Sequence, residues 1–174
     1  MDPKILEEKL AKIKLLVMDV DGTLTDGKVY YSKNGEELKV FSIRDGMGIE
    51  LLKKGNIEVA IMTSETTEIV TARANKLKIN NVILGSHNKK RDLLTLADKL
   101  GISIDCIAFI GDDINDKQAI EIAGIGACPK NSTSSILEVA DLVCTKDGGD
   151  GAVRELAELI LLSQNKQITL PENW

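Results

Sequence analysis

The feature that most constrains this chain is an apolar run that ends on two aspartates. Residues 13–18 are almost entirely apolar, which is typical of a central strand covered on both faces of a parallel sheet. Asp19 and Asp21 follow, and Gly22 allows a sharp turn. Carboxylates this close repel each other unless a cation, a shared proton or a donor compensates. We interpret them as a candidate Mg²⁺ site with one nucleophilic and one proton-transferring carboxylate; the alternative is an ordinary Asx-type turn.

Strands and helices alternate along the rest of the chain, and this predicts an α/β fold with a doubly wound, Rossmann-like parallel sheet. We expect further strands near 57–62, 82–85, 106–110, 125–128 and 142–144, and helices near 1–12, 49–54, 68–77, 89–100, 119–123, 133–140 and 152–162. Residues 28–42 are predicted to form a β-hairpin, and a Gly-rich segment with a last helix occupies about 147–163. We expect one domain over residues 1–174.

Composition excludes several classes of function. The net charge of −5 and the pI near 5.0 argue against non-specific binding to nucleic acid, and 3% aromatic residues leave little for base stacking. The three cysteines have no C-x-x-C spacing, which favours buried thiols in a reducing compartment over a zinc site or disulfides. No run has transmembrane length and the N-terminus lacks a signal-peptide core, so we expect a cytoplasmic protein with no membrane partner.

Two more polar clusters follow predicted strands. Thr63 comes after the strand near 57–62, and Asp112 with Asp113 comes after the strand near 106–110. Because the carboxyl ends of parallel strands lie at one edge of a sheet, these side chains are expected to meet Asp19 and Asp21 in one crevice. Lys89, at the start of a predicted helix, would supply the positive charge that such a cluster needs to admit a phosphate; alone it would be an ordinary surface lysine.

The chain resembles phosphatases of the haloacid dehalogenase superfamily in four motifs spread over most of its length. The D-x-D-G-T sequence over 19–23 is similar to the first motif, Thr63 to the second and Lys89 to the third. The fourth corresponds to Gly-Asp-Asp at 111–113 together with Asp116. Each piece is weak alone, but their order and spacing together are specific.

The resemblance implies a role for each catalytic residue. Asp19 would attack phosphorus and become an aspartyl phosphate, and Asp21 would protonate the leaving sugar oxygen and then deprotonate water. Thr63 and Lys89 would bind the phosphoryl oxygens as charge develops.

The resemblance also implies the metal ligands. Mg²⁺ would be held by Asp19, the Asp21 backbone carbonyl and Asp112. Asp113 would orient metal-bound water or Lys89, and Asp116 would support the same cluster.

Within this superfamily the chain is similar to the capless subgroup of 3-deoxy-2-ulosonate phosphate phosphatases. The hairpin stands where larger members carry a cap domain, and residues 25–27, 43–48 and 148–155 carry the closer match. The subgroup implies a sugar-acid phosphate as the small-molecule substrate. It also implies a homotetramer in which the hairpins associate and neighbouring subunits cover the active site.

The residues disagree about which sugar acid is bound. Arg44 resembles enzymes for octulosonate 8-phosphate, and a guanidinium is a suitable partner for a carboxylate; Arg154 lies in the closely matching segment. Ser64-Glu65 departs from the Gly-Arg usual in those enzymes and, with Lys76, is more similar to enzymes for nonulosonate 9-phosphates. Glu65 and Lys76 have an alternative as a helix cap and a solvated charge. We expect 3-deoxy-D-manno-octulosonate 8-phosphate, with a nonulosonate 9-phosphate as the alternative.

Two non-enzymatic functions compete with a phosphatase. A phosphoacceptor regulatory domain also uses aspartates on a doubly wound sheet, but it should lack an acid/base group such as Asp21 beside the nucleophile. A catalytically inactive assembly module would retain the fold and lose part of the site. The complete set Asp19, Asp21, Thr63, Lys89 and Asp112 argues against it.

Overall fold

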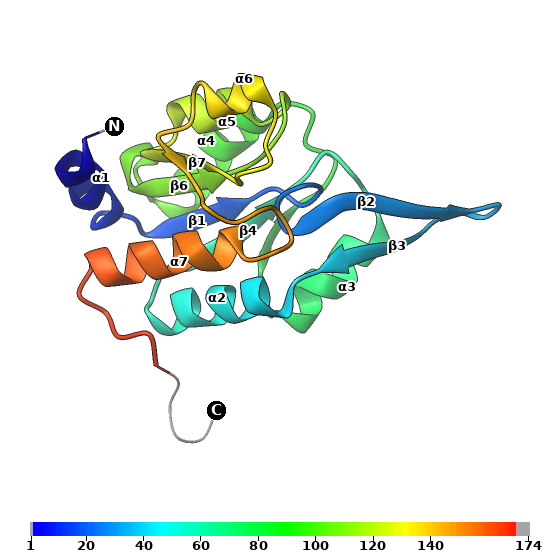
Figure 1. Ribbon diagram of the computed structural model, residues 1–174, viewed down its shortest axis with the longest axis horizontal. Helices are drawn as coiled ribbons and strands as arrows, with labels where there is room; N and C mark the ends of the chain where they lie inside the picture. The colour runs from blue at the N-terminus through cyan, green and yellow to red at the C-terminus, as the bar shows by residue number, and fades with distance from the viewer. Residues whose placement is uncertain (1, 170–174) are drawn as a thin grey trace.

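The computed structural model describes residues 2–169, and its centre is a six-stranded parallel sheet (Figure 1). The two ends of the predicted range 1–174, Met1 and 170–174, lie outside the described residues. The strand order is β5-β4-β1-β6-β7-β8, and each neighbouring pair is parallel. The strands are β1 (Leu15–Met18), β4 (Glu58–Met62), β5 (Asn81–Ile83), β6 (Ile107–Ile110), β7 (Ile125–Cys128) and β8 (Leu142–Val143). The prediction of a doubly wound α/β fold is confirmed.

Helices cover both faces of the sheet, and β1 shows why its sequence is apolar throughout. Leu16 and Met18 pack into the core under α2 (Ile43–Lys54), α3 (Glu68–Lys76) and α7 (Ala152–Ser163). Leu15 and Val17 pack into the opposite core, under α4 (Lys89–Leu100), α5 (Lys117–Ile122) and α6 (Ser134–Leu137). The N-terminal helix α1 (Pro3–Leu10) packs against α7 (Figure 1). Since both faces are covered, polar groups of β1 can emerge only at its end.

Helix α2 begins six residues before the predicted start at 49. Ser42 caps it, with its side chain accepting hydrogen bonds from the backbone N–H groups of Arg44 and Asp45. Two glycines made this segment look like a loop, but Gly48 faces α7, where an added Cβ would lie only 2.9 Å from the Cα of Arg154. The glycine therefore permits close packing of two helices and does not end a helix.

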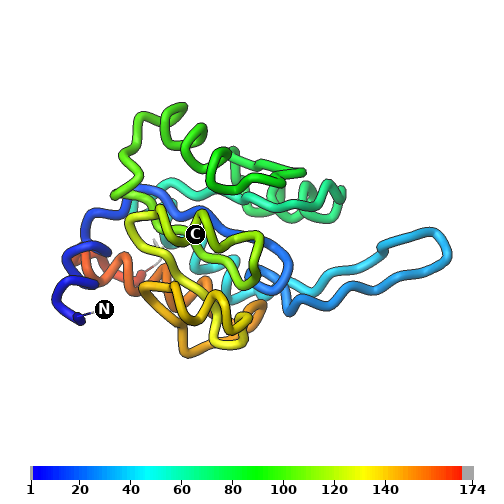
Figure 2. The backbone as a smooth tube through the Cα atoms, turned by 90° about the horizontal axis from the view of Figure 1, so that it is seen from above, coloured from blue at the N-terminus to red at the C-terminus, as the bar shows by residue number. Residues whose placement is uncertain are grey.

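The predicted hairpin is confirmed as β2 (Thr25–Ser32) and β3 (Gly35–Phe41), which pair antiparallel and project from the body of the molecule (Figure 2). Tyr30 lies opposite Leu38, and both side chains are exposed. Lys39, between the exposed Leu38 and Val40, is instead buried against the body of the protein. The two faces of the hairpin therefore have different surroundings. Over residues 2–169, no helix is long and apolar enough to cross a membrane.

Candidate active site

The ends of three adjacent strands meet at one cavity. Asp19 follows β1, Thr63 follows β4 and Asp112 follows β6, and β1 lies between the other two strands. The cavity has a volume of about 260 Å³. Its lining consists of Asp19, Asp21, Gly22, Gly27, Thr63, Ser64, Glu65, Asp112, Asp113 and Asn115. The convergence that the parallel-sheet topology predicted is present.

Lys89 forms a buried ion-paired centre behind this cavity. It is the first residue of α4, and its Nζ lies 2.5 Å from Asp19 Oδ1 and 2.5 Å from Asp116 Oδ1. The side chain is 1% exposed, so the ammonium depends on these carboxylates in place of water. Lys89 therefore fixes the orientation of Asp19 and neutralises part of the acidic cluster.

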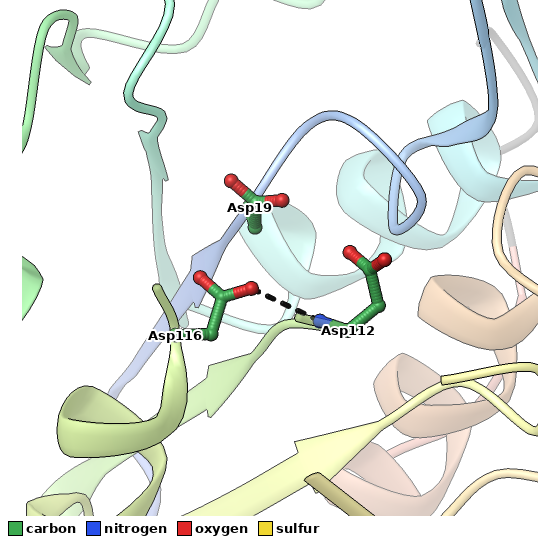
Figure 3. Close-up of side chains that lie close together, drawn as sticks. All are labelled: Asp19, Asp112 and Asp116. Carbon is green, nitrogen blue, oxygen red and sulfur yellow. Dashed lines mark hydrogen bonds between the residues drawn. The ribbon is translucent and has the colours of Figure 1, made fainter. Parts of the chain in front are cut away.

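Asp116 makes more contacts in the site than its sequence position indicated. Its Oδ2 accepts hydrogen bonds from the backbone N–H groups of Asp112 (3.0 Å) and Asp113 (3.2 Å), as Figure 3 shows for Asp112. Of the two roles expected for Asp113, orienting metal-bound water or Lys89, the contact with Lys89 is absent among the described residues. Asp116 takes that position, and Asp113 Oδ1 accepts from the N–H of Ile114. The reason is the tight turn after β6, which directs Asp116 back beneath the two aspartates that precede it.

Three carboxylates form a cluster that could hold a metal ion. One oxygen each from Asp19, Asp112 and Asp116 lies within 4.8 Å of the others (Figure 3). Asp116 already accepts hydrogen bonds from Lys89 and from two backbone N–H groups. Within residues 2–169, Asp112 Oδ1 accepts only from Thr23 Oγ1, at 3.0 Å. The remaining oxygens of Asp19 and Asp112 are hard anionic ligands of the kind that Mg²⁺ prefers. The donor set fits such a cation.

The electrostatics of the cluster indicate a deficit of positive charge. Burial, with the nearby charge of Asp116, raises the pKa of Asp19 to about 8, although Lys89 opposes the shift. Burial also raises the pKa of Asp112 to about 6, against the hydrogen bond from Thr23. A divalent cation beside these groups would reverse the shifts by favouring the ionised carboxylates.

Gly22 is required where the loop after β1 passes Asp112. Its φ is +84°, and an added Cβ would lie 2.1 Å from Asp112 Oδ2. The Gly-rich segment before α7 supports the same loop: a Cβ on Gly148 would lie 1.7 Å from the carbonyl oxygen of Gly22, and the N–H of Gly149 donates to the carbonyl of Thr23. Part of the closely matching segment 148–155 therefore shapes the loop after β1.

The hairpin contributes a residue that the sequence did not indicate. Lys39 Nζ lies 2.5 Å from Asp21 Oδ1 and 3.5 Å from Glu36 Oε1. Its side chain is 1% exposed, whereas that of Asp21 is 29% exposed and borders the cavity. The hairpin thus contacts the residue expected to transfer protons.

The residues expected to bind the sugar are not gathered in one place in this chain. Ser64 and Glu65 line the cavity beside Thr63. Arg44 and Arg154 line a separate cavity, of about 370 Å³, and Lys76 lines a third of about 530 Å³. Arg154 is paired with Glu158 at 2.6 Å. Of this set, one copy of the chain brings only Ser64 and Glu65 to the strand ends.

Asn115 was missed by the sequence reasoning. It lies in the turn after β6, lines the cavity, and donates from Nδ2 to Ser64 Oγ at 3.2 Å. Ser64 in turn donates to the backbone carbonyl of Ser86. The only sequence signal for Asn115 was its place between the two acidic positions Asp113 and Asp116.

Comparison with known proteins defines the class to which this chain belongs. Residues 53–156 match the family model described as haloacid dehalogenase-like hydrolase. The chain belongs to this family of hydrolases, as its motifs indicated.

Individual relatives narrow the comparison further. The chain is 40% identical to the 3-deoxy-D-manno-octulosonate 8-phosphate phosphatase KdsC of Salmonella typhi over 91% of this chain and 84% of that protein. The corresponding phosphatase of Moraxella catarrhalis, crystallised with magnesium, phosphate and KDO, is 42% identical, with a TM-score of 0.91 over 95% of this chain and 94% of that one. A cobalt-bound form of the Haemophilus influenzae phosphatase is 35% identical, with a TM-score of 0.88 over 90% and 92% of the two chains.

Proposed function

We propose that this protein is a Mg²⁺-dependent phosphatase that removes the terminal phosphate from 3-deoxy-D-manno-octulosonate 8-phosphate. The observation that carries the proposal is the buried Asp19–Lys89–Asp116 arrangement at the ends of β1 and β6, with Asp112 beside it. The relatives named above support the substrate, because they match almost the whole chain.

The reaction has two displacements, in which Asp19 is the nucleophile and then the leaving group, and Asp21 transfers the protons. An oxygen of Asp19 attacks phosphorus, the bond from phosphorus to the sugar oxygen breaks, and Asp21 gives its proton to that oxygen. Water then attacks the aspartyl phosphate, its proton passes to Asp21, and Asp19 leaves as a carboxylate with release of inorganic phosphate. Thr63, on the cavity wall, and Lys89, behind it, bind or neutralise the phosphoryl oxygens.

Asp19 and Asp112, with the backbone carbonyl of Asp21, would hold the Mg²⁺. When bound, the ion supplies positive charge that favours ionised Asp19 and offsets the charge of the phosphoryl group. Asp116 orients Lys89 and the backbone of Asp112, and Asp113 faces the cavity as a partner for water.

Glu65 and Ser64 contact the sugar within the subunit. Arg44, Arg154 and Lys76 lie outside the cavity of their own subunit, so they recognise the substrate only if a neighbouring copy brings them to it. We propose such an assembly, a homotetramer formed through the exposed apolar face of the hairpin. The three free cysteines support a reducing compartment, and we assign the enzyme to the cytoplasm.

A phosphate-release screen tests the proposal. Octulosonate 8-phosphate, nonulosonate 9-phosphates and hexose 6-phosphates are compared with Mg²⁺ and with a chelator. We expect the first to have the highest kcat/KM, chelation to abolish release, and Asp19→Asn to be inactive. Highest activity on a nonulosonate phosphate would favour the alternative substrate that Glu65 suggests. Equal turnover of all substrates would refute the sugar-acid assignment, and full activity of Asp19→Asn would refute the mechanism.

A further inference from the structure

Lys39 is the one buried residue of β3, and the body of the protein, not the hairpin, buries it. Its neighbours Leu38 and Val40 are 61% and 48% exposed, because alternate residues of a strand face opposite sides. The Lys39 side chain is 1% exposed and points to the loop after β1, where it meets Asp21. The hairpin therefore has one outward apolar face and one inward charge.

Stability alone does not explain a buried ammonium in this position. Removing a charge from water carries a penalty that a single ion pair often does no more than offset, so the pair by itself is weak evidence of a gain in stability. Burial lowers the pKa of Lys39, but the hydrogen bond and charge of Asp21, together with Glu36, raise it overall. Lys39 therefore remains charged beside Asp21.

The contact divides the two oxygens of the Asp21 carboxylate. Oδ1 accepts the hydrogen bond from Lys39, and Oδ2 has no hydrogen-bond partner among residues 2–169. The Asp21 side chain is 29% exposed, and without this contact it would rotate about its side-chain bonds and lose that freedom only when substrate binds. Fixing one oxygen in advance leaves the other available for proton transfer at a defined position.

We propose that Lys39 is a positioning residue, which holds Asp21 so that its free oxygen delivers the proton to the leaving group. This inference rests on the proposed phosphatase function and adds the hairpin to the catalytic machinery. Lys39 itself does not touch the reacting atoms. It acts through Asp21, so its importance depends on how much the leaving group needs a proton.

That dependence separates positioning from a general structural effect. A sugar alkoxide is a poor leaving group and needs protonation, whereas 4-nitrophenolate leaves without it. The constant kcat/KM covers binding and the first displacement, in which the leaving group departs. Misplacing Asp21 should therefore reduce kcat/KM for alkyl phosphates and leave that for 4-nitrophenyl phosphate nearly unchanged, while damage to the fold or to the Asp19 site reduces both.

The experiment measures kcat/KM of the full-length protein with Mg²⁺ for octulosonate 8-phosphate, a hexose 6-phosphate and 4-nitrophenyl phosphate. General acid catalysis contributes ~10²–10⁴-fold, so we expect Lys39→Met to lose about tenfold or more on the alkyl phosphates and less than about threefold on 4-nitrophenyl phosphate. Asp21→Asn should show the same selectivity with a larger loss, and Lys39→Arg, which keeps the charge, should recover part of it. Lys28→Met, which removes an exposed hairpin lysine, is the matched control.

An equal loss on alkyl and aryl phosphates, or no loss, would overturn the role of Lys39. If Lys39→Met does not fold by circular dichroism, Lys39→Gln provides the same comparison with a shorter polar side chain. The wild type separates this inference from the proposed function. No hydrolysis by wild type refutes the phosphatase. Hydrolysis of the simple phosphates without octulosonate 8-phosphate refutes only the substrate, and the test of Lys39 then uses the hexose phosphate.

Discussion

At the scale of the residue, the active site is short of positive charge. Asp19, Asp112 and Asp116 lie together with Lys89 as the one ammonium in direct contact among the described residues. The raised pKa values of Asp19 and Asp112 express this shortage, because burial without enough positive charge favours the protonated carboxyls. A divalent cation corrects it, so metal binding and proton release are linked.

This linkage predicts how pH changes stability. With pKa values of about 8 and about 6 in the folded state, Asp19 and Asp112 bind more protons when folded than when unfolded. The free energy of unfolding of the metal-free protein therefore falls as pH rises from about 4 to 8. Mg²⁺ must displace these protons, so the Tm increase that it produces should grow from pH 5.5 to pH 8, about the range of the shifted values.

Scanning fluorimetry at fixed Mg²⁺, against chelator, measures this Tm increase at each pH. The same titration of Asp112→Asn is the control and should give a smaller increase at every pH, because one ligand is lost. A Tm increase that is the same at every pH for the wild type would contradict the linkage.

Gly22 gives a second prediction at this scale. Gly22→Ala combines a strained φ of +84° with a methyl group on Asp112 Oδ2, so we expect weaker Mg²⁺ binding and loss of most activity. Gly101→Ala is the matched control, because Gly101 has φ +64° and no heavy atom within 4 Å of the added Cβ. Both variants should lose about 1–3 kcal/mol of stability from the backbone, but only Gly22→Ala should raise the Mg²⁺ concentration for half-maximal activity. Similar Mg²⁺ curves for the two would be evidence against this explanation.

Single residues also mark the limit of sequence reasoning. Lys89 was predictable, because it stands at the start of a helix at the carboxyl edge of the sheet. The partnership of Lys89 with Asp116 depends on a tight turn, and that of Lys39 with Asp21 depends on a hairpin whose register shifts twice. Neither geometry can be obtained from residue types and spacing.

At the scale of the element, Asp45 joins two helices that cover the same face of the sheet. It lies in the first turn of α2 and is 1% exposed. Its Oδ1 accepts from the N–H of Arg154 at 2.8 Å and its Oδ2 from that of Gly151 at 3.2 Å, at the N-terminus of α7. These N–H groups have no partner within their own helix, so Asp45 serves as a cap supplied by a distant segment.

Removing this cap should destabilise the protein without altering the site directly. We expect Asp45→Ala to lose about 1–3 kcal/mol in urea unfolding, because two N–H groups at the start of α7 lose their acceptor. Asp45→Asn retains one acceptor oxygen and should lose less. Asp98→Ala, on the exposed face of α4, should stay within about 0.5 kcal/mol of the wild type. An Asp45→Ala loss no larger than that of Asp98→Ala would mean that the interhelical cap contributes little.

The same pair of helices explains the main error in the predicted elements. The start of α2 was placed at 49 because Gly46 and Gly48 lower helix propensity. Close packing explains both glycines: a Cβ on Gly46 would meet the guanidinium of Arg73, and a Cβ on Gly48 would meet α7. The apolar runs identified the strands, because strands covered on both faces are apolar throughout. Helix propensity could not distinguish a glycine in a loop from a glycine that permits close helix packing.

At the scale of the whole molecule, the hairpin extends the active site on one side and exposes apolar surface on the other. Lys39 faces Asp21, whereas Tyr30, Leu38 and Val40 form an outer hairpin face, with exposures of 53%, 61% and 48%. A two-stranded hairpin is marginal in water by itself, and this one projects from the body (Figure 2). Association of hairpins would bury the outer face and hold Lys39 in place, which would couple assembly to catalysis.

This coupling gives the last prediction. Leu38→Glu puts a charge on the outer hairpin face, so light scattering after size exclusion should show a smaller assembly than the wild type. Its kcat/KM for octulosonate 8-phosphate should fall by about tenfold, as for Lys39→Met, because a hairpin without partners holds Asp21 less well. Leu94→Glu alters an exposed leucine on α4 and should change neither quantity. If Leu38→Glu dissociates the assembly and retains full activity on alkyl phosphates, then the hairpin positions Asp21 without help from its neighbours; if the wild type is itself a monomer, the outer face has another use.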